Sequence, residues 1–496
     1  MANLEEVFRL SGVPTHTYVE PERYNEIKVS IRAPGRCVVL EGPSGIGKTT
    51  IATKVLEELN LSGTQVLFRA RRPSDVASIE KLPQDDDFGL AIIDDFHRLS
   101  DKLRSSLSDL MKLLADTEDE KRKLVLIGIN KAGQQLVQYG RDLGLRLDVY
   151  RLEANSREKI EDLLGLGEKA LKIELTDKVN IAERAQGSFQ IAQMLAHKIC
   201  ATAGVTETCK QNTRIDISVD GVIEDVLTDL GYQFKSTLIA FARGKKIRPE
   251  GRAPYLHILR WLSESDDGAV DLHEITNTHP EMKGSIVQVV EKGFLSGLLN
   301  DSDHSNDFAN LFHYDDETGI IGIEDPKLLF YLKNLVWRAF TYQCGFSQEY
   351  FDSKYDYALS FAGAQRGIAE ELAERLIERD IGVFYDFNEQ HLLLGENVEE
   401  YLTKIYRSEA TFVVPLLSPD YPTRIWTKIE SEAFRDRFGD GAVFPIRLST
   451  VEDGFFNDIS KYGCLTYDAK KVHEEELDRI IEALSARLRV ERRKKL

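Results

Sequence analysis

The chain has 496 residues, and 64 Lys and Arg against 82 Asp and Glu give it a formal net charge of −18. At roughly 150 residues per domain, this length corresponds to about three domains, because a single hydrophobic core does not grow to this size. The apolar fraction of 42%, with 34 glycines besides, is that of a globular protein and excludes disorder over most of the chain. The acidity argues against a protein that grips nucleic-acid phosphates over its whole surface.

The cysteines and the apolar runs bear on the compartment. Five cysteines lie far apart, without a C-x-x-C pair or histidine partners at zinc spacing, which favours buried thiols over a metal or disulfide role. The N-terminus lacks the apolar stretch of a signal peptide, and no run approaches the roughly 20 apolar residues of a membrane span. The sequence therefore predicts a cytoplasmic protein without membrane contact. The cysteines are Cys37, Cys200, Cys209, Cys344 and Cys464.

A phosphate-binding loop is predicted at residues 42–49. The β-rich run Cys37–Leu40 leads into Gly-Pro-Ser-Gly-Ile-Gly-Lys-Thr, and a helical pattern follows, so that G-x-x-x-x-G-K-[ST] stands in its strand–loop–helix context. In such a loop the glycines let backbone N–H groups point at phosphate oxygens. Lys48 would neutralise the β- and γ-phosphates, and the Thr49 hydroxyl would hold Mg²⁺. The candidate ATP-binding residues of this loop are Gly42, Ser44, Gly45, Gly47, Lys48, Thr49 and Thr50.

A second acidic strand is needed beside this loop, and residues 88–95 supply it. Four apolar residues end in two carboxylates, of which Asp94 would contact the Mg²⁺ shell and Asp95 would orient or deprotonate the attacking water. Asn130 ends the next apolar strand, where its side chain would reach the γ-phosphate or its water. Two arginines follow, either of which can serve as an arginine finger toward a neighbouring subunit: Arg141 and Arg146.

These motifs resemble the AAA+/STAND family of ATPases over roughly residues 1–340. The resemblance implies that an apolar segment with a proline, ahead of the first strand, packs on the adenine, and Val13, Pro14 and Tyr18 are the candidates; a plain leader strand is the alternative. It also implies a helical lid, which begins with a helix capped at Asn155. Phe189 stands where the family often has proline.

The middle of the chain resembles a winged helix. Three short helical patterns, 255–263, 272–276 and 285–292, precede two strands around an Asp/Gly turn at 311–323. The third pattern lacks side chains that read base edges, and the turn is acidic, which favours a hinge that locks or releases the ATPase over a DNA reader. Modules of this kind in the family present a histidine to the nucleotide, and three candidates remain open: His257, His273 and His279.

From Tyr355 onward, short apolar strands alternate with amphipathic helices, which predicts a parallel, flavodoxin-like sheet with its site at the carboxyl ends of the strands. Blocks at 356–366, 382–398 and 417–421, followed by Trp426-Thr-Lys-Ile-Glu430, resemble a TIR domain of the bacterial type. The resemblance implies NAD⁺ cleavage, which is the activity of enzymatic TIR domains. Breaking the nicotinamide–ribose bond of NAD⁺ passes through an oxocarbenium-like centre, which a nearby carboxylate stabilises.

The TIR resemblance implies a set of NAD⁺-site residues. Glu430, four residues after a tryptophan, holds the position of the catalytic acid; the alternative is that Glu430 is a surface glutamate on a helix that also carries Glu432. Arg366 would meet the pyrophosphate, and Trp426 would form an aromatic wall. The nicotinamide riboside end is implied to bind at Phe361, Ala362 and Gly363. Asp386 begins the segment that is implied to pack on the next subunit and help complete the site.

The predicted fold class is therefore multidomain α/β: a P-loop ATPase with a helical lid (1–205), a connector with a winged helix (206–345), a TIR domain (350–488) and a solvated basic helix end (489–496). The expected function is an ATP-regulated, oligomerising NAD⁺ hydrolase in bacterial antiphage defence, with ATP or ADP, Mg²⁺ and NAD⁺ as ligands. The ATPase and TIR domains would both mediate homo-oligomerisation. No sensor repeats are recognisable, which predicts a separate trigger protein. A non-catalytic TIR scaffold and an ATP-driven nucleic-acid remodeller are the alternatives, and nucleic acid is not an expected partner.

Overall fold

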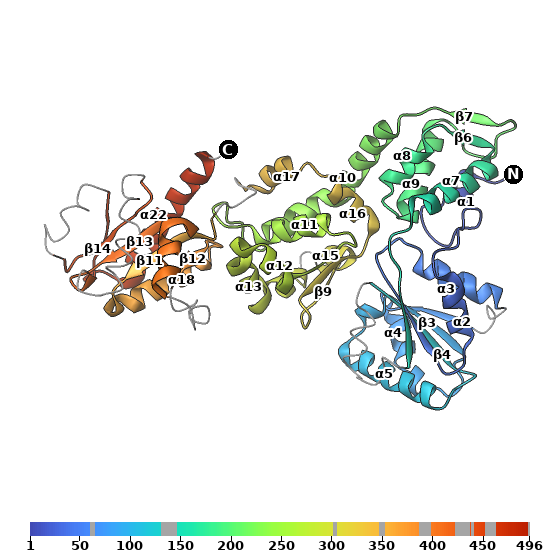
Figure 1. Cartoon of the computed structure of the whole chain (residues 1–496), viewed down its shortest axis with the longest axis horizontal. Coiled ribbons are helices and arrows are strands. Elements are labelled where there is room, and N and C mark those ends of the chain that lie inside the picture. The colour runs from blue at the N-terminus through green and yellow to red at the C-terminus, as the bar shows by residue number, and fades with distance from the viewer. Residues whose placement is uncertain are drawn as a thin grey trace.

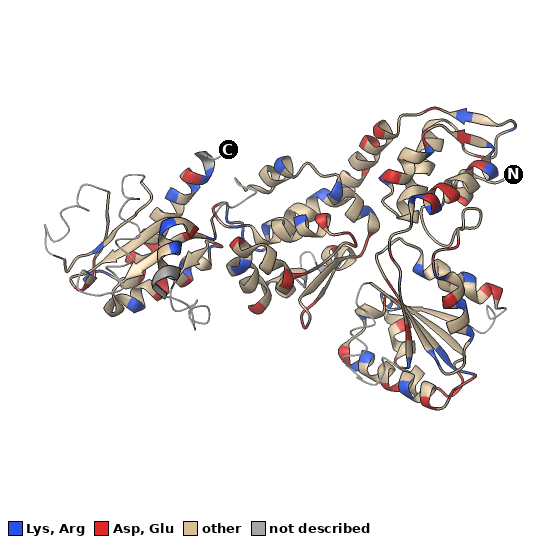
Figure 2. Cartoon of the chain, viewed as in Figure 1, with Lys and Arg blue, Asp and Glu red and all other residues tan. Residues whose placement is uncertain are grey.

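The computed structural model describes residues 1–59, 65–129, 146–300, 305–346, 353–385, 398–421, 437, 441–451 and 463–494. These residues form an elongated molecule in which an N-terminal sheet, a helical lid, a mostly helical middle part and a C-terminal sheet follow one another (Figure 1). Within them, no helix combines the length and the apolar character that crossing a membrane requires. Basic and acidic residues are interspersed over all four parts (Figure 2).

The N-terminal sheet is parallel, with the strand order β2-β3-β4-β1-β5. Its inner strands are buried on both faces, as continuous apolar runs require. One face packs on α2 and α3 and the other on α5, which gives two separate apolar clusters. The elements are β1 (Cys37–Glu41), β2 (Gln65–Arg69), β3 (Leu90–Asp94), β4 (Lys123–Gly128), β5 (Leu147–Arg151), α2 (Tyr24–Arg32), α3 (Lys48–Glu58), α4 (Pro73–Ile79) and α5 (Asp101–Asp116).

The lid is a helical unit that also holds the start of the chain. Its first helix is capped by Ser156, whose side chain accepts from the Lys159 N–H, so the cap lies one residue after the predicted Asn155. Helix α1 packs against α7 and α9, and two short strands pair in parallel beside them. The elements are α1 (Leu4–Val7), α7 (Arg157–Leu171), β6 (Ile173–Leu175), α8 (Lys178–Arg184), α9 (Phe189–Thr202) and β7 (Thr213–Ile215).

The middle part begins with α10 (Val219–Arg243), a long helix in a stretch to which the sequence analysis assigns no element. It packs against α9 of the lid and against α11 and α16, so lid and middle share one apolar core. Short helices and an antiparallel sheet of order β8-β10-β9 lie where the winged helix is predicted. The elements are α11 (Pro254–Glu264), β8 (Ala269–Asp271), α12 (Leu272–Thr278), α13 (Lys283–Glu291), α14 (Phe294–Leu299), α15 (Ser305–Leu311), β9 (Phe312–Asp315), β10 (Ile320–Ile323), α16 (Pro326–Lys333) and α17 (Trp337–Cys344).

The C-terminal sheet is also parallel, with the order β12-β11-β13-β14-β15 that is typical of flavodoxin-like folds. Apolar clusters cover both of its faces. Together the two parallel sheets confirm the predicted α/β fold class. The elements are β11 (Tyr355–Phe361), α18 (Arg366–Ile377), β12 (Val383–Phe384), α20 (Val398–Lys404), β13 (Ala410–Leu417), β14 (Ile446–Leu448), β15 (Leu465–Tyr467) and α22 (His473–Lys494).

A buried ionic triad joins the middle part to the C-terminal sheet. Arg252, in the loop after α10, donates from Nε to Asp356 Oδ2 at 2.9 Å, and Arg492 of α22 donates from Nη2 to Oδ1 at 2.8 Å. All three side chains are at most 4% exposed. Arg492 lies in the segment predicted to be a solvated basic end, and that prediction is wrong for this residue. A basic residue near a chain end is ordinarily solvated, and its partner lies 136 positions away in the sequence.

The two guanidinium groups determine the charge of Asp356. Burial by itself would raise the pKa of this carboxyl, but the charges of Arg252 and Arg492, with the Gly382 N–H, hold it at about 2. Asp356 therefore stays ionised, and both arginines depend on it for their counter-charge. An ion pair that loses one partner leaves a buried charge uncompensated.

We expect Asp356→Ala to destabilise the junction by about 3–5 kcal/mol, because two buried guanidinium groups lose their carboxylate. Urea unfolding of the full chain measures this as a lower midpoint. Asp478→Ala is the matched control, since Asp478 is 66% exposed in its pair with Arg375 and its loss costs at most about 1 kcal/mol. Equal midpoints for the two variants would contradict the inference that the triad stabilises the junction between the middle part and the C-terminal sheet.

Candidate functional site

A cavity of about 410 Å³ opens at the carboxyl ends of β1, β3 and β4. Its lining includes the loop before α3, the acids at the end of β3, the segment Arg9–Pro21, and α9 of the lid. Glu324, which follows β10 of the middle part, also lines it. A volume of this size suits a nucleotide-sized ligand, and the carboxyl edge of a parallel sheet is where such ligands bind.

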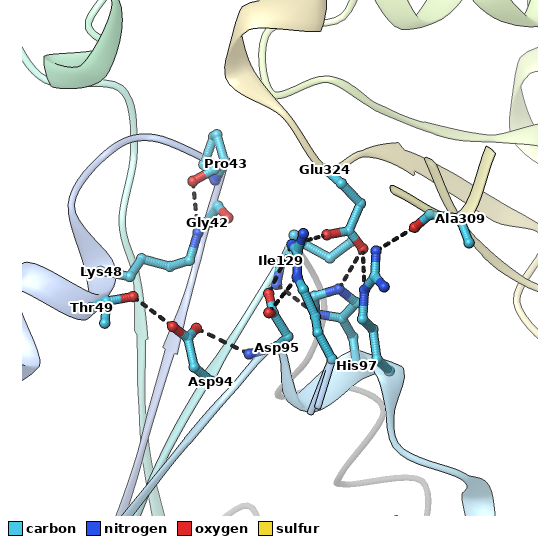
Figure 3. A network of polar contacts seen from close by, with 12 residues as sticks. Gly42, Pro43, Lys48, Thr49, Asp94, Asp95, His97, Ile129, Ala309 and Glu324 are labelled. Atoms are coloured by element: carbon cyan, nitrogen blue, oxygen red, sulfur yellow. Dashed lines mark hydrogen bonds and ion pairs between the residues drawn. The ribbon is translucent and has the colours of Figure 1, made fainter. Parts of the chain in front are cut away.

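The loop between β1 and α3 adopts a conformation that its glycines make possible. Gly42, Gly45 and Gly47 all have positive φ, and a Cβ on Gly42 would lie 2.3 Å from the Leu152 carbonyl oxygen. Lys48 begins α3 and donates from Nζ to the carbonyl oxygens of Gly42 and Pro43, at 2.8 and 2.7 Å (Figure 3). The predicted loop residues from Ser44 to Thr50 line the cavity.

The two groups predicted to hold Mg²⁺ lie together. Thr49 Oγ1 donates to Asp94 Oδ2 at 2.9 Å, and Asp94 Oδ1 accepts from the Asp95 N–H at 3.0 Å (Figure 3). Burial raises the pKa of Asp94, as does the neighbouring charge of Asp95. A hydroxyl and a carboxylate are hard oxygen ligands of the kind that Mg²⁺ takes, so these residues fit the ion. Thr49 and Asp94 would hold Mg²⁺, which would supply positive charge against the phosphates.

Asp95, which is predicted to orient or deprotonate the attacking water, contacts an arginine that the sequence analysis did not identify. Its backbone is left-handed, with φ of 58°, a strained conformation that clusters at functional sites. Arg71 Nε contacts Asp95 Oδ2 at 2.5 Å, and Arg71 Nη2 contacts Oδ1 at 3.1 Å. Arg71 lies two residues after the end of β2, whose last residue, Arg69, pairs with Asp94. Its position at the same edge of the sheet as the two acids was the signal that could have identified it.

Glu324 ties the middle part to this edge of the sheet. Its carboxylate accepts from Arg71 Nη2 at 2.5 Å and from Arg98 Nε at 3.1 Å, and it lies 2.9 Å from His97 Nε2 (Figure 3). Burial would raise the pKa of Glu324, but the His97 hydrogen bond and the arginine charges hold it well below its usual range. The side chain is 1% exposed, so the carboxylate is a buried, ionised anchor. The next residue but one, Pro326, lies against Gly45 of the phosphate loop.

A second histidine lies beside this network. The rings of His97 and His313 are 4.6 Å apart in an edge-to-face arrangement. Burial and the neighbouring His97 lower the pKa of His313 to about 3, which keeps it neutral. The ligand atoms of His97, His313 and Glu324 lie within 4.8 Å of one another, a spacing at which a metal ion fits. Two guanidinium groups already balance the Glu324 carboxylate, which weighs against a cation there.

The other residues predicted for the ATPase site have different outcomes. Val13, Pro14 and Tyr18 line the cavity, as expected of a base pocket. None of the three predicted histidines is among its described lining residues; His257 is buried in α11, and His279 stacks on Trp261. The histidine that does line it is His97, from the turn after β3. Arg146 pairs with Asp116 at 2.9 Å. Asn130 and Arg141 lie outside the described residues.

The predicted NAD⁺ residues that the structure describes gather at the carboxyl end of β11. Phe361 ends that strand and stacks on Tyr385, with ring centroids 5.6 Å apart, and the Arg366 guanidinium lies 5.5 Å from the same Phe361 ring. Ala362 and Gly363 follow directly and begin the short turn before α18. Arg366 is thus held over the end of the strand. Asp386, Trp426 and Glu430 lie outside the described residues.

Comparison with known proteins agrees with this division. Residues 18–142 match the family model described as novel STAND NTPase 3, and residues 358–481 match that of the TIR domain. The chain is 39% identical over 84 residues to the 3' cyclic ADP-D-ribose synthase AaTIR of Aquimarina amphilecti, covering 17% of this chain and 26% of that protein. It is 26% identical over 197 residues to the Holliday junction branch migration complex subunit RuvB of Staphylococcus haemolyticus, covering 35% and 58% of the two chains.

Among solved structures, the RuvB Holliday junction branch migration motor of Thermotoga maritima is similar with a TM-score of 0.34 and 20% identity, over 49% of this chain and 82% of that one. This chain thus spans about a quarter and somewhat over half of the lengths of the two curated relatives. The family matches establish a STAND-type NTPase domain followed by a C-terminal TIR domain.

The affinity of the cavity for ATP should depend on pH through Lys48. Burial lowers the pKa of this ammonium to about 8, against the opposing charges of Asp94, Asp95 and Glu324. Phosphate binding favours the charged form, so we expect affinity to be constant between pH 7 and 8 and to fall by up to about tenfold per pH unit above that. Titration calorimetry with ATP from pH 7 to 9.5 measures the slope.

Lys48→Ala is the control, because it removes the titrating group. We expect it to bind ATP about 10- to 150-fold more weakly at pH 7, the value of a hydrogen bond to a charged group, and without the decline above pH 8. The same decline in the variant would assign the pH dependence to another residue.

Proposed function

We propose that this protein is an NAD⁺-cleaving TIR enzyme whose activity is controlled by the nucleotide bound to its STAND domain. The reaction would break the nicotinamide–ribose bond, releasing nicotinamide and leaving ADP-ribose, linear where water attacks the ribose carbon and cyclic where a hydroxyl of the same molecule does. In a bacterial cell, sustained cleavage would deplete NAD⁺, which suits antiphage defence. Assembly of several copies, set off by a separate trigger protein, would bring TIR domains together.

The observation that carries this proposal is the likeness of the TIR segment to a cyclic ADP-ribose synthase at 39% identity, joined to a phosphate loop with both acids in place. Glu430, after Trp426, supplies the carboxylate for the oxocarbenium-like centre. The described end of the site fits the substrate: an aromatic pair, Phe361 and Tyr385, offers a face for the nicotinamide ring, and the Arg366 charge beside it suits the pyrophosphate.

Control by nucleotide is supported by the contacts of Glu324. The same arginine, Arg71, contacts both Glu324 of the middle part and Asp95, so a change at Asp95 reaches one of the contacts that hold the middle part. Pro326 lies against the phosphate loop itself. A ligand that binds one arrangement of these groups better than the other shifts the equilibrium between them. The buried triad at Arg252 then passes the position of the middle part to the TIR domain.

We expect Glu430→Ala to lower nicotinamide release from NAD⁺ by about 100-fold or more, since it removes the carboxylate that stabilises the developing positive charge. The measurement is nicotinamide released by the purified full chain with ATP and Mg²⁺ over a range of protein concentrations. Glu432→Ala is the matched control and should retain activity. Equal release by wild type and Glu430→Ala would refute the catalytic proposal, and assembly without any NAD⁺ turnover would indicate a TIR scaffold instead.

Glu324→Ala should raise NAD⁺ turnover in the absence of a trigger by several-fold. Without this carboxylate, Arg71 and Arg98 lose a shared partner and the buried His97 ring loses its hydrogen bond, which weakens the attachment of the middle part to the ATPase sheet. Glu317→Ala is the control, because Glu317 is exposed in the β9–β10 turn of the same hairpin. Unchanged or lower turnover in Glu324→Ala would contradict a restraining role.

A further inference from the structure

The base end of the cavity contains a buried amide for which neither the motifs nor the family matches assign a role. Gln193 lies on α9, is 6% exposed and lines the cavity. Phe189, one helical turn earlier on the same side, lies near Gly47 of the phosphate loop. Gln193 is therefore a turn farther from the phosphates, beside the segment Arg9–Pro21 that forms the opposite wall.

The orientation of this amide is fixed by its neighbours. Gln193 Oε1 accepts from the backbone N–H of Arg9 at 2.8 Å, and Thr17 Oγ1 lies 3.4 Å away. A backbone N–H can only donate, so the oxygen of the amide must face Arg9. Thr17, which is 1% exposed, also donates to the Val7 carbonyl at 2.9 Å and holds the same loop. Both contacts of Gln193 involve the amide oxygen, and the amide nitrogen Nε2 has no hydrogen-bond partner among the described residues.

The side chain of Gln193 lines the cavity and its N–H₂ is accessible from it, so a bound ligand can supply the missing hydrogen-bond acceptor. The lining of the cavity also includes Leu163 of α7 and Val13 and Pro14 of the N-terminal segment, which offer apolar surface for a flat ring system. Adenine presents acceptor nitrogens at its ring edge, whereas its exocyclic amine donates. The donor of Gln193 therefore matches a ring nitrogen and not the amine.

We propose that Gln193 is the base-reading residue of the nucleotide site: its oxygen anchors the Arg9–Pro21 wall, and its N–H₂ donates to a ring nitrogen of adenine. The proposal rests on nucleotide binding as given above. It assigns one amide two separable tasks, and a single substitution separates them. Gln193→Glu keeps an oxygen for the Arg9 N–H but replaces the donor by an ionised acceptor, while Gln193→Leu removes both groups.

The test is calorimetric affinity of the full chain for ATP at pH 7.5. We expect Gln193→Glu to bind ATP about 3- to 10-fold more weakly, the value of one hydrogen bond, and Gln193→Leu to lose at least as much. Thr202→Leu is the control for substitutions on this helix and should bind as wild type does, because Thr202 is an exposed residue at the end of α9 and is not among the described lining residues of the cavity. Wild-type affinity in Gln193→Glu would overturn the base-reading role.

Three analogues identify the acceptor. 1-Deaza-ATP, 3-deaza-ATP and 7-deaza-ATP each lack one of the three acceptor nitrogens of the adenine ring, and we expect one of them to bind wild type about 3- to 10-fold more weakly than ATP while binding Gln193→Leu as ATP does. If all three analogues bind wild type as ATP does, the proposal is wrong. Failure of wild type to bind ATP at all would instead refute nucleotide control, so the two failures are distinguishable.

Discussion

The buried carboxylate of Glu324 is the constraint on which the arrangement of the N-terminal half depends. It stands between two domains, and three basic groups from the ATPase sheet converge on it. A charge this deeply buried is tolerable only while its partners stay in place. The position of the middle part and the geometry of the ATPase acids are therefore not independent, because Arg71 belongs to both. Burial makes this a discrete contact that is either formed or broken.

A buried carboxylate also lies at the junction between the middle part and the TIR domain. There the carboxylate is Asp356 of the TIR domain, and the two guanidinium groups come from the loop after α10 and from the end of α22. Between the two junctions the lid and middle part share one apolar core. The chain is thus a series of rigid parts with ionic contacts at both junctions, and ionic contacts give a specific geometry more than they give stability. Such a series suits transmission of a change from one end to the other.

Local patterns predicted the parts of the structure that local patterns determine. The phosphate loop was recognisable because glycines at fixed spacing meet a backbone requirement, and the two acids because they end an apolar strand. The TIR sheet was predictable from alternating strands and helices. In contrast, Arg71, Glu324 and Gln193 act through partners between 24 and 253 positions away, and the sequence around each is that of an ordinary surface residue. Arg492 was wrongly predicted to be solvated because its partners are distant in the sequence. Helix α10 was not assigned although it has a local signal: Ser218 caps it, and its buried residues recur every three or four positions.

The construction of the Asp356 triad has a consequence for how such chains can be recombined. Its members come from three separate segments: a loop some hundred residues before the TIR strand, the start of that strand, and the last turns of the closing helix. A TIR domain transplanted at the linker near residue 350 would bring Asp356 and Arg492 but meet a foreign loop in place of Arg252. Its aspartate would then be under-compensated in a closed interface. The TIR domain is therefore not freely exchangeable between chains. Functional chimaeras should keep the loop after α10, which carries Arg252, together with the TIR domain whose Asp356 it contacts.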